Sequence, residues 1–168
     1  MNIQFYLEKL KESQEFDRFL KENPSAFLCG GFFILDKKNT LQDQQNLDFF
    51  IPVKKEMISF NLKNFEKNKI ELVNKEIEPI KIPEEIDFDF KEIENLLEKK
   101  INEQKIKNKA EKFLFSLQRK NNENFLIGTI FLDKLSLIKF QINLSKKEIT
   151  DFEKKSFFDL IKFIKKEK

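Results

Sequence analysis

The chain offers one thiol and no imidazole, which removes much of the nucleophilic and metal chemistry known in proteins. Cys29 is the only cysteine among 168 residues, and it precedes the pair Gly30 and Gly31. Without a histidine no Cys-His pair can form, and no neighbour in the sequence would lower the pKa of the thiol. No phosphate-binding Lys-Ser/Thr follows the glycines. We therefore interpret Cys29 as a packing residue, and the glycines as the site of a bulge or of close helix packing.

Carboxylates are the remaining candidates for metal binding. Glu85, Asp87 and Asp89 alternate with apolar residues, so an extended backbone would present all three on one face, where Ca²⁺ or Mg²⁺ could bind. Carboxylates also favour the start of a helix, and we interpret these three as a solvated face that leads into a helix cap. Zinc sites are built mainly from cysteine and histidine, and the chain has one cysteine and no histidine. The sequence thus predicts no metal and no cofactor.

Acid–base catalysis by carboxylates is weakly indicated. A hydrolase of this kind needs one carboxyl group in an apolar pocket. Asp48 and Asp151 stand among apolar strand residues, but among 29 acidic residues no pair has a distinctive spacing. We predict a non-enzymatic protein, with a carboxylate-based hydrolase as a distant alternative.

Paired lysines are the third chemical feature. They occur at Lys54 and Lys55, at Lys146 and Lys147, and at residues 154–155. At one end of a sheet, among phenylalanines, they could bind a single nucleic-acid strand by charge and stacking. However, 32 basic and 29 acidic residues give a net charge of only +3, and two arginines are few. Lysines in turns also protect sheet edges. Nucleic-acid binding is therefore the alternative, and the four turn lysines are candidate residues for binding a protein partner.

The elements that must position these residues follow from apolar periodicity. The first half predicts a helix over 2–22, ended by Asn23-Pro24, and then three strands over 26–36, 46–52 and 57–62. A fourth short strand is predicted around 70–73. The stretch AFLCGGFFILD is apolar on both faces, which predicts a central strand buried on both sides and bent at its glycines. It is too short to cross a membrane, which takes about 20 residues.

The second half repeats this order. A helix is predicted from Asp89, with Glu92 as its capping-box partner, to about 105. Strands follow over 113–117, 125–132 and 137–144. For 145–155 we favour a hairpin over an early helix, because Lys-Lys-Glu also separates two apolar strands in the first half. That recurrence suggests an internal duplication.

A last helix is predicted from Ser156 onward. Its sequence FFDLIKFIKKEK is amphipathic and basic, and docking on the domain would use one apolar stripe. Phe158 or Phe163 would then remain for contact with a partner or a second copy.

This organisation resembles PepSY-type repeats, in which a helix packs across a three-stranded antiparallel sheet. The runs KENPSAFLCGGFFILD and LDFFIPVKKEMISF resemble the first half of a small tandem PepSY-like family of archaea and uncultured bacteria. The runs FLFSLQ, FLIGTIFLD and LIKFQINLSKKEI resemble the second half, with SKKE where TGE is typical. The resemblance implies an α+β fold of two α-β-β-β units with antiparallel sheets, helices on one face and a C-terminal helix. It also implies a link to peptidase propeptides and protein inhibition.

The predicted organisation is a first unit over 1–73, an extended connector over 74–88, and a second unit over 89–168. The first residues lack the apolar core of a secretory signal, so the expected compartment is the cytoplasm. We predict a protein-binding or self-associating module without a transmembrane segment, inhibitory or regulatory by analogy with PepSY repeats.

Overall fold

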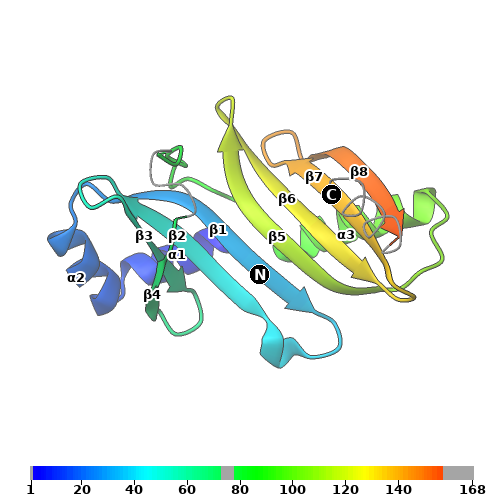
Figure 1. Cartoon of the computed structure of the whole chain (residues 1–168), viewed down its shortest axis with the longest axis horizontal. Helices are drawn as coiled ribbons and strands as arrows, with labels where there is room; N and C mark the ends of the chain where they lie inside the picture. The colour runs from blue at the N-terminus through cyan, green and yellow to red at the C-terminus, as the bar shows by residue number, and fades with distance from the viewer. Residues whose placement is uncertain (1, 73–77, 157–168) are drawn as a thin grey trace, which may run out of the picture.

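Eight strands form one antiparallel sheet, and in Figure 1 the first and third helices lie behind it while the second lies at its left-hand end. The computed structural model describes residues 2–72 and 78–156. The sheet order is β4-β3-β2-β1-β5-β6-β7-β8. The strands are β1 (Phe27–Asp36), β2 (Gln44–Ile51), β3 (Glu56–Asn61), β4 (Lys67–Ile70), β5 (Ala110–Lys120), β6 (Glu123–Leu132), β7 (Ser136–Asn143) and β8 (Glu148–Ser156). The helices are α1 (Ile3–Lys11), α2 (Gln14–Glu22) and α3 (Phe90–Glu103), with a short 3₁₀ turn η1 (Thr40–Gln42) before β2.

The expected fold of two α-β-β-β units is wrong, although an α+β protein with an antiparallel sheet is confirmed. β1 and β5 pair from Gly31–Leu117 to Asp36–Lys112, so the strands of both halves belong to one sheet. Each half also contributes a fourth strand, β4 or β8, at an outer edge. The predicted C-terminal helix cannot begin at Ser156, because β8 runs through that residue. The rest of that helix, with Phe158 and Phe163, lies outside the described residues.

The first helix of the prediction is two helices. Ser13 interrupts it: its hydroxyl accepts the backbone N–H of Phe16 at 3.3 Å, which caps α2. Asn2 caps α1 in the same manner, and Asn23 ends α2 as expected. The two helices then pack on the sheet through separate apolar stripes.

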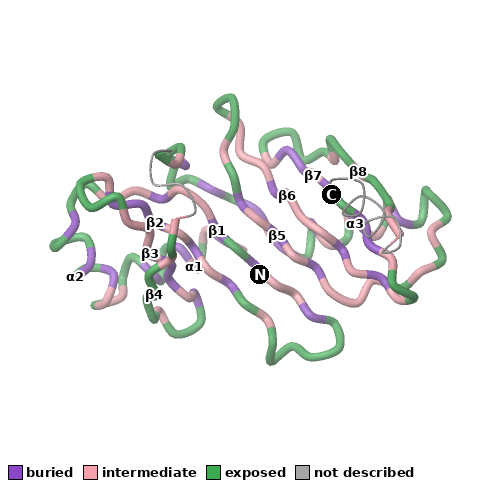
Figure 2. The backbone as a smooth tube through the Cα atoms, in the orientation of Figure 1, coloured by how far each residue is buried: buried purple, intermediate pink, exposed green. Residues whose placement is uncertain are grey.

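The core lies between the helices and the sheet. Phe16 of α2 packs against Phe49 and Phe60 with ring centroids 4.9 and 5.2 Å apart. Phe90 of α3 contacts Phe33 of β1 and Phe115 of β5 at 4.8 and 5.4 Å. The strands alternate between buried residues and more exposed ones (Figure 2). One continuous layer of phenylalanine, leucine and isoleucine side chains therefore joins all three helices to the sheet.

Glycines have two different roles in the central strands: one lies at a β-bulge and one allows a close contact between strands. In β1 the register with β2 shifts between Leu28 and Gly30, which is the predicted bulge. In β6 the register runs past Gly128 without a shift. A Cβ on Gly128 would instead lie 2.1 Å from the carbonyl oxygen of Leu114 and 2.6 Å from Cζ of Phe140. Gly128 is needed for this close contact.

The hairpin predicted over 145–155 is confirmed, because β7 and β8 pair from Asn143–Glu148 to Ser136–Ser156. The repeat that suggested it is misleading. One Lys-Lys-Glu turn joins β2 to β3 and the other joins β7 to β8. In the symmetric strand order, the counterpart of the β2–β3 turn is the β6–β7 turn. The two motifs therefore do not occupy equivalent positions.

Candidate functional site

The face of the sheet opposite the helices carries a cluster of apolar side chains centred on Leu114. Ile34 of β1 lies directly opposite Leu114 of β5 in the strand register. Ile127 and Phe131 of β6 lie diagonal to Leu114, and so does Phe32 of β1, which is 38% exposed. The remaining four are half-buried. We name Phe32, Ile34, Leu114, Ile127 and Phe131 the sheet-face patch.

Alternation along the strands explains why the patch faces outward. Phe33, Phe113 and Phe115, which flank its members in sequence, are fully buried against the helices. Neighbouring side chains point to opposite faces of a strand. In the described residues no helix covers the patch (Figure 1). The expectation that the first strand is buried on both faces is therefore not met.

Paired charges border the patch at one end. Asp36 is only 8% exposed, and its carboxylate contacts the Lys112 ammonium at 2.8 Å and accepts the backbone N–H groups of Lys38 and Asn39 at 2.9 Å. The Lys112 hydrogen bond, followed by the one from Asn39, lowers the pKa of Asp36 below its ordinary value. Lys38 also pairs with Glu111 at 2.6 Å. These residues, with Ile34, Leu114 and Phe131, line an open depression of about 630 Å³.

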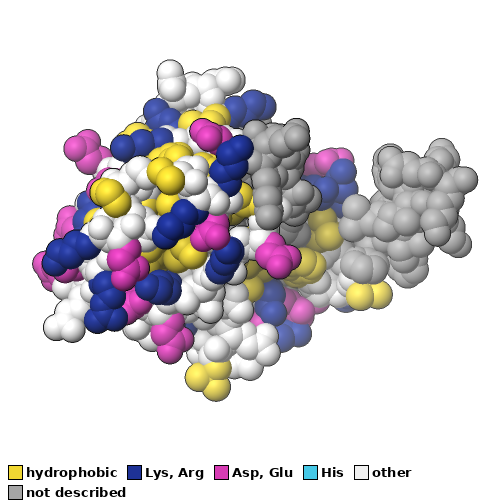
Figure 3. All heavy atoms as spheres, turned by 60° about the vertical axis from the view of Figure 1, so that its left-hand side comes forward, with side chains coloured by type: hydrophobic (Ala, Val, Ile, Leu, Met, Phe, Trp, Pro, Cys, Tyr) yellow, Lys and Arg dark blue, Asp and Glu magenta, His cyan; other side chains and the backbone are white. Residues whose placement is uncertain are grey.

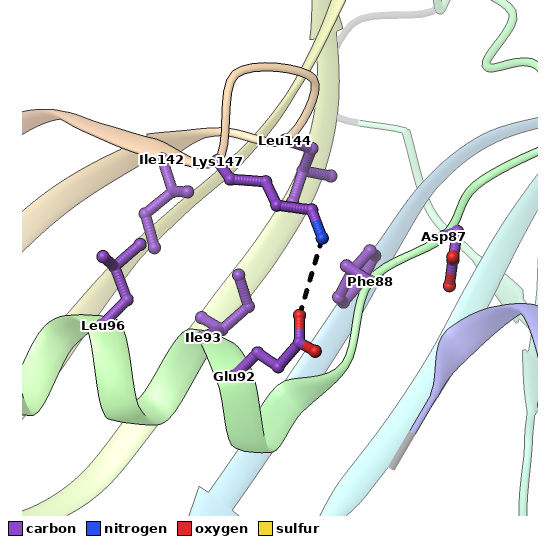
Figure 4. Close-up of a pocket in the computed structure, with 8 residues that line it drawn as sticks. All are labelled: Asp87, Phe88, Glu92, Ile93, Leu96, Ile142, Leu144 and Lys147. Atoms are coloured by element: carbon purple, nitrogen blue, oxygen red, sulfur yellow. Dashed lines mark ion pairs between the residues drawn. The ribbon is translucent and has the colours of Figure 1, made fainter.

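A second feature is a crevice on the helix side, between α3 and the end of β7 (Figure 4). It has a volume of about 160 Å³, and its walls are apolar. At its mouth Nζ of Lys147 lies 3.7 Å from Oε2 of Glu92. The lining residues are Asp87, Phe88, Glu92, Ile93, Leu96, Ile142, Leu144 and Lys147.

The predicted lysine pairs do not form one basic surface. Lys54 and Lys55 lie in the β2–β3 turn, and Lys146 and Lys147 lie in the β7–β8 turn, with β1, β5 and β6 between them in the sheet. Lys54 donates to Oδ1 of Asn23 at 2.7 Å, and Lys146 pairs with Glu123 at 3.2 Å. Lys55 and Lys147 have φ angles of 51° and 52°, as turn residues. Basic and acidic side chains are interspersed on the face shown in Figure 3.

Lys154 and Lys155 belong to the other end of the sheet. They pair with Ile138 and Leu137 in the β7–β8 register, away from the β7–β8 turn. Their ammonium groups contact Asn108 at 2.8 Å and Glu153 at 3.0 Å. The three lysine pairs therefore do not lie together at one end of the sheet.

Cys29 is a poor nucleophile in this environment. Its Sγ lies 3.3 Å from the carbonyl oxygen of Asp48 and 3.5 Å from Sδ of Met57. Burial, with a smaller contribution from the charge of Asp48, raises the pKa of the thiol to about 12. Packing remains the interpretation that the contacts favour.

The candidate carboxylates lie apart. Asp48 accepts the Ser59 hydroxyl at 2.6 Å, and burial raises its pKa, whereas Asp151 is exposed on edge strand β8. Asp89 caps α3 by accepting the Lys91 N–H at 2.7 Å, as predicted. Asp87 accepts Nδ2 of Asn2 at 2.6 Å. Within residues 2–72 and 78–156, no three metal-binding side chains form a cluster.

Sequence reasoning missed the sheet-face patch, although its signal was present. The strand AFLCGGFFILD is apolar on both faces, and this pattern predicts burial on both sides. A strand with one face against helices and one face against a partner has the same pattern. The crevice had no such signal, because its walls come from residues 87–96 and 142–147, which meet only in the fold.

Comparisons with known proteins identify a solved structure of similar fold and no protein of established function. No protein-family model and no curated protein matches the chain. A solved structure with a similar fold is that of a protein named "putative lipoprotein" from Clostridium difficile 630. The TM-score is 0.52 at 12% sequence identity, over 83% of this chain and 89% of the other. In the described ranges, every helix is too short or too polar to cross a membrane.

Proposed function

We propose that the chain is a non-enzymatic module that binds another protein through the face of the sheet opposite the helices. The observation that supports this is the sheet-face patch. Phe32 and its four neighbours form an apolar cluster on the middle strands, interspersed with Ser116 and Thr129 and bordered by paired charges. Exposed apolar patches with a polar rim are typical of interaction sites.

The size of this face suits a protein partner. Five strands about 4.8 Å apart, each with about eight residues at 3.3 Å, cover on the order of 600 Å². A standard interface takes about 800 Å² from each partner. An interface on β2, β1, β5, β6 and β7 would therefore have nearly the usual area, with its apolar centre at Leu114.

The electrostatics favour a protein over a nucleic acid. The rim pairs Asp36–Lys112 and Lys38–Glu111 are each neutral as pairs. The predicted lysine pairs are separated by three strands. The described residues therefore offer a polyanion no continuous basic surface. We propose that this binding has an inhibitory or regulatory role.

Photo-crosslinking tests the proposal. A benzophenone amino acid replaces Phe32, and the purified protein is irradiated in an extract of its host. The matched control carries the same group at Phe5, which is 50% exposed on α1 at the opposite side of the sheet. We expect a defined crosslinked protein with Phe32 and not with Phe5.

The captured protein is then purified, and its affinity for the native chain and for the Leu114→Asp variant is measured. A charge at the centre of the patch should weaken binding at least tenfold, because a desolvated charge without a partner is costly. A crosslink to a second copy of the chain would identify the partner as itself. Equal affinity of the variant, or equal crosslinking at Phe5, would refute the assignment of this face.

A further inference from the structure

The crevice beneath α3 has the size of a single aromatic ring. Its volume is about 160 Å³. An apolar cavity of about 150 Å³ is large enough to hold one benzene molecule. The crevice is open at its mouth, so a ring of this size can enter it from solvent.

Its walls fit the body of an apolar ligand. Ile142 is fully buried, and Phe88 and Ile93 are 5% and 7% exposed. Leu96 of α3 and Leu144, in the turn after β7, pack against the same core. Figure 4 shows the lining side chains of α3 and β7 facing one another across this space. The charged groups that line it belong to Asp87, Glu92 and Lys147.

The mouth offers one hydrogen-bond donor and one acceptor. Nζ of Lys147 and Oε2 of Glu92 are 3.7 Å apart, which is longer than the 2.7–2.9 Å typical of a charge-assisted hydrogen bond. Both side chains are largely exposed, at 75% and 69%. The pair is therefore loose, and a polar group placed beside it can contact both partners. Asp87 lies beyond Phe88 in Figure 4 and already accepts Nδ2 of Asn2.

The charges at the mouth select the polar group. A ligand carboxylate would be repelled by Glu92, and a ligand ammonium would be repelled by Lys147. A hydroxyl group accepts from Lys147 and donates to Glu92 without separating the pair. A phenol is neutral near pH 7, because its pKa is about 10.

We propose that this crevice is a binding site for a small neutral phenol. The ring lies among Phe88, Ile93 and Ile142, and the hydroxyl lies between Lys147 and Glu92. The methylene stem of Lys147 covers the ring from the β7–β8 turn, as long cationic side chains commonly do over apolar surface. The site is on the helix side of the sheet, so it is separate from the sheet-face patch.

The experiment is an NMR titration of the ¹⁵N-labelled chain with four probes of equal ring size. Phenol carries the hydroxyl, toluene replaces it with a methyl group, and benzoate and benzylammonium carry opposite charges. We expect phenol to bind more tightly than the other three and to shift the amide resonances around Phe88, Ile93 and Ile142. Toluene binding as tightly as phenol, a preference for either ion, or shifts confined to other regions would overturn the proposal. So would the absence of shifts with all four probes.

Matched variants in one turn test the role of the mouth. Lys147→Met keeps an apolar stem and removes the donor, and Lys146→Met is the control, because Lys146 pairs with Glu123 away from the crevice. Loss of a hydrogen bond to a charged group should weaken phenol binding roughly ten- to hundredfold and leave toluene binding unchanged. Equal effects of the two variants would refute the proposed contact.

A third variant, Leu144→Phe, fills the crevice from its strand side. It should abolish binding of both phenol and toluene, while the amide spectrum of β1, β5 and β6 stays unchanged. If phenol still binds to this folded variant, the ligand lies elsewhere and the site is wrongly assigned.

Discussion

Replacing Gly128 with alanine tests the packing that supports the sheet-face patch. The added Cβ would lie 2.1 Å from the Leu114 carbonyl oxygen and 2.6 Å from the Phe140 ring. Real Cβ contacts below 3.0 Å essentially do not occur, so strands β5 and β6 must move apart by about 1 Å. Overpacking in a core usually costs about 1–3 kcal/mol. Because the obstacle here is backbone, we expect a loss of about 3 kcal/mol in the free energy of unfolding, at the upper end of that range.

The matched control is Gly30→Ala in strand β1, which is separated from β6 by β5. There the nearest atoms to an added Cβ are the Leu117 carbonyl oxygen at 3.4 Å and Oδ2 of Asp48 at 3.6 Å, which are ordinary contacts. The described glycines have no positive φ angle, so alanine fits this backbone. It should raise stability by about 0.5 kcal/mol, because it restricts the unfolded chain.

Urea unfolding followed by circular dichroism measures both variants, with the slope m showing whether the transition stays cooperative. A loss of about 3 kcal/mol is a large share of the 5–15 kcal/mol typical of a domain, so it is easily resolved. A Gly128→Ala protein within 0.5 kcal/mol of the native chain would refute the reasoning. So would equal losses for the two glycines.

Three further predictions follow from single side chains. With a pKa of about 12, roughly one Cys29 thiol in 10⁴ is ionised at pH 8, so its alkylation by iodoacetamide should be about a thousandfold slower than that of free cysteine and should recover in urea. The pKa of Asp36 is lower in the folded chain than in the unfolded one. Its contribution to stability is therefore present above the unfolded pKa, near 4, and is lost as the pH falls through the folded pKa. Asp36→Asn should flatten the acid side of a stability–pH curve measured by urea unfolding. Asn121 and Asn122 have φ angles of 50° and 62° in the β5–β6 turn, so Asn122→Gly should raise the melting temperature, with a gain of about 0.5–1 kcal/mol, and a decrease would contradict a turn of this type.

The local elements were predictable because their signals are local. Alternating apolar residues marked β2, β3, β5 and β7 to within a few residues. Asp89 was identified as a cap from its position before an apolar helical stripe. Ser13 could also have been recognised as a cap, since serine is a preferred residue at that position.

The arrangement of the sheet was not predictable from the same signals. Periodicity does not say which strand pairs with which. The pairing of β1 with β5 joins two strands that are far apart in the sequence and similar in composition. The Lys-Lys-Glu recurrence gave a false alignment of the halves, because lysine suits many turns. The crevice depends on Glu92 and Lys147, which are brought together only when α3 packs against the second half of the sheet.

The central pairing of β1 with β5 also has a consequence for synthesis of the chain. Roughly 80 residues separate the paired positions, such as Gly31 and Leu117, and contacts of that range form slowly. At about 5–20 residues per second, the ribosome needs several seconds or more to complete β5 after β1 has emerged. During that interval β1 has an open edge that bears Phe32 and Ile34, and such an edge readily pairs with other chains. We therefore expect the nascent first half to be the stage at which this protein is most exposed to aggregation.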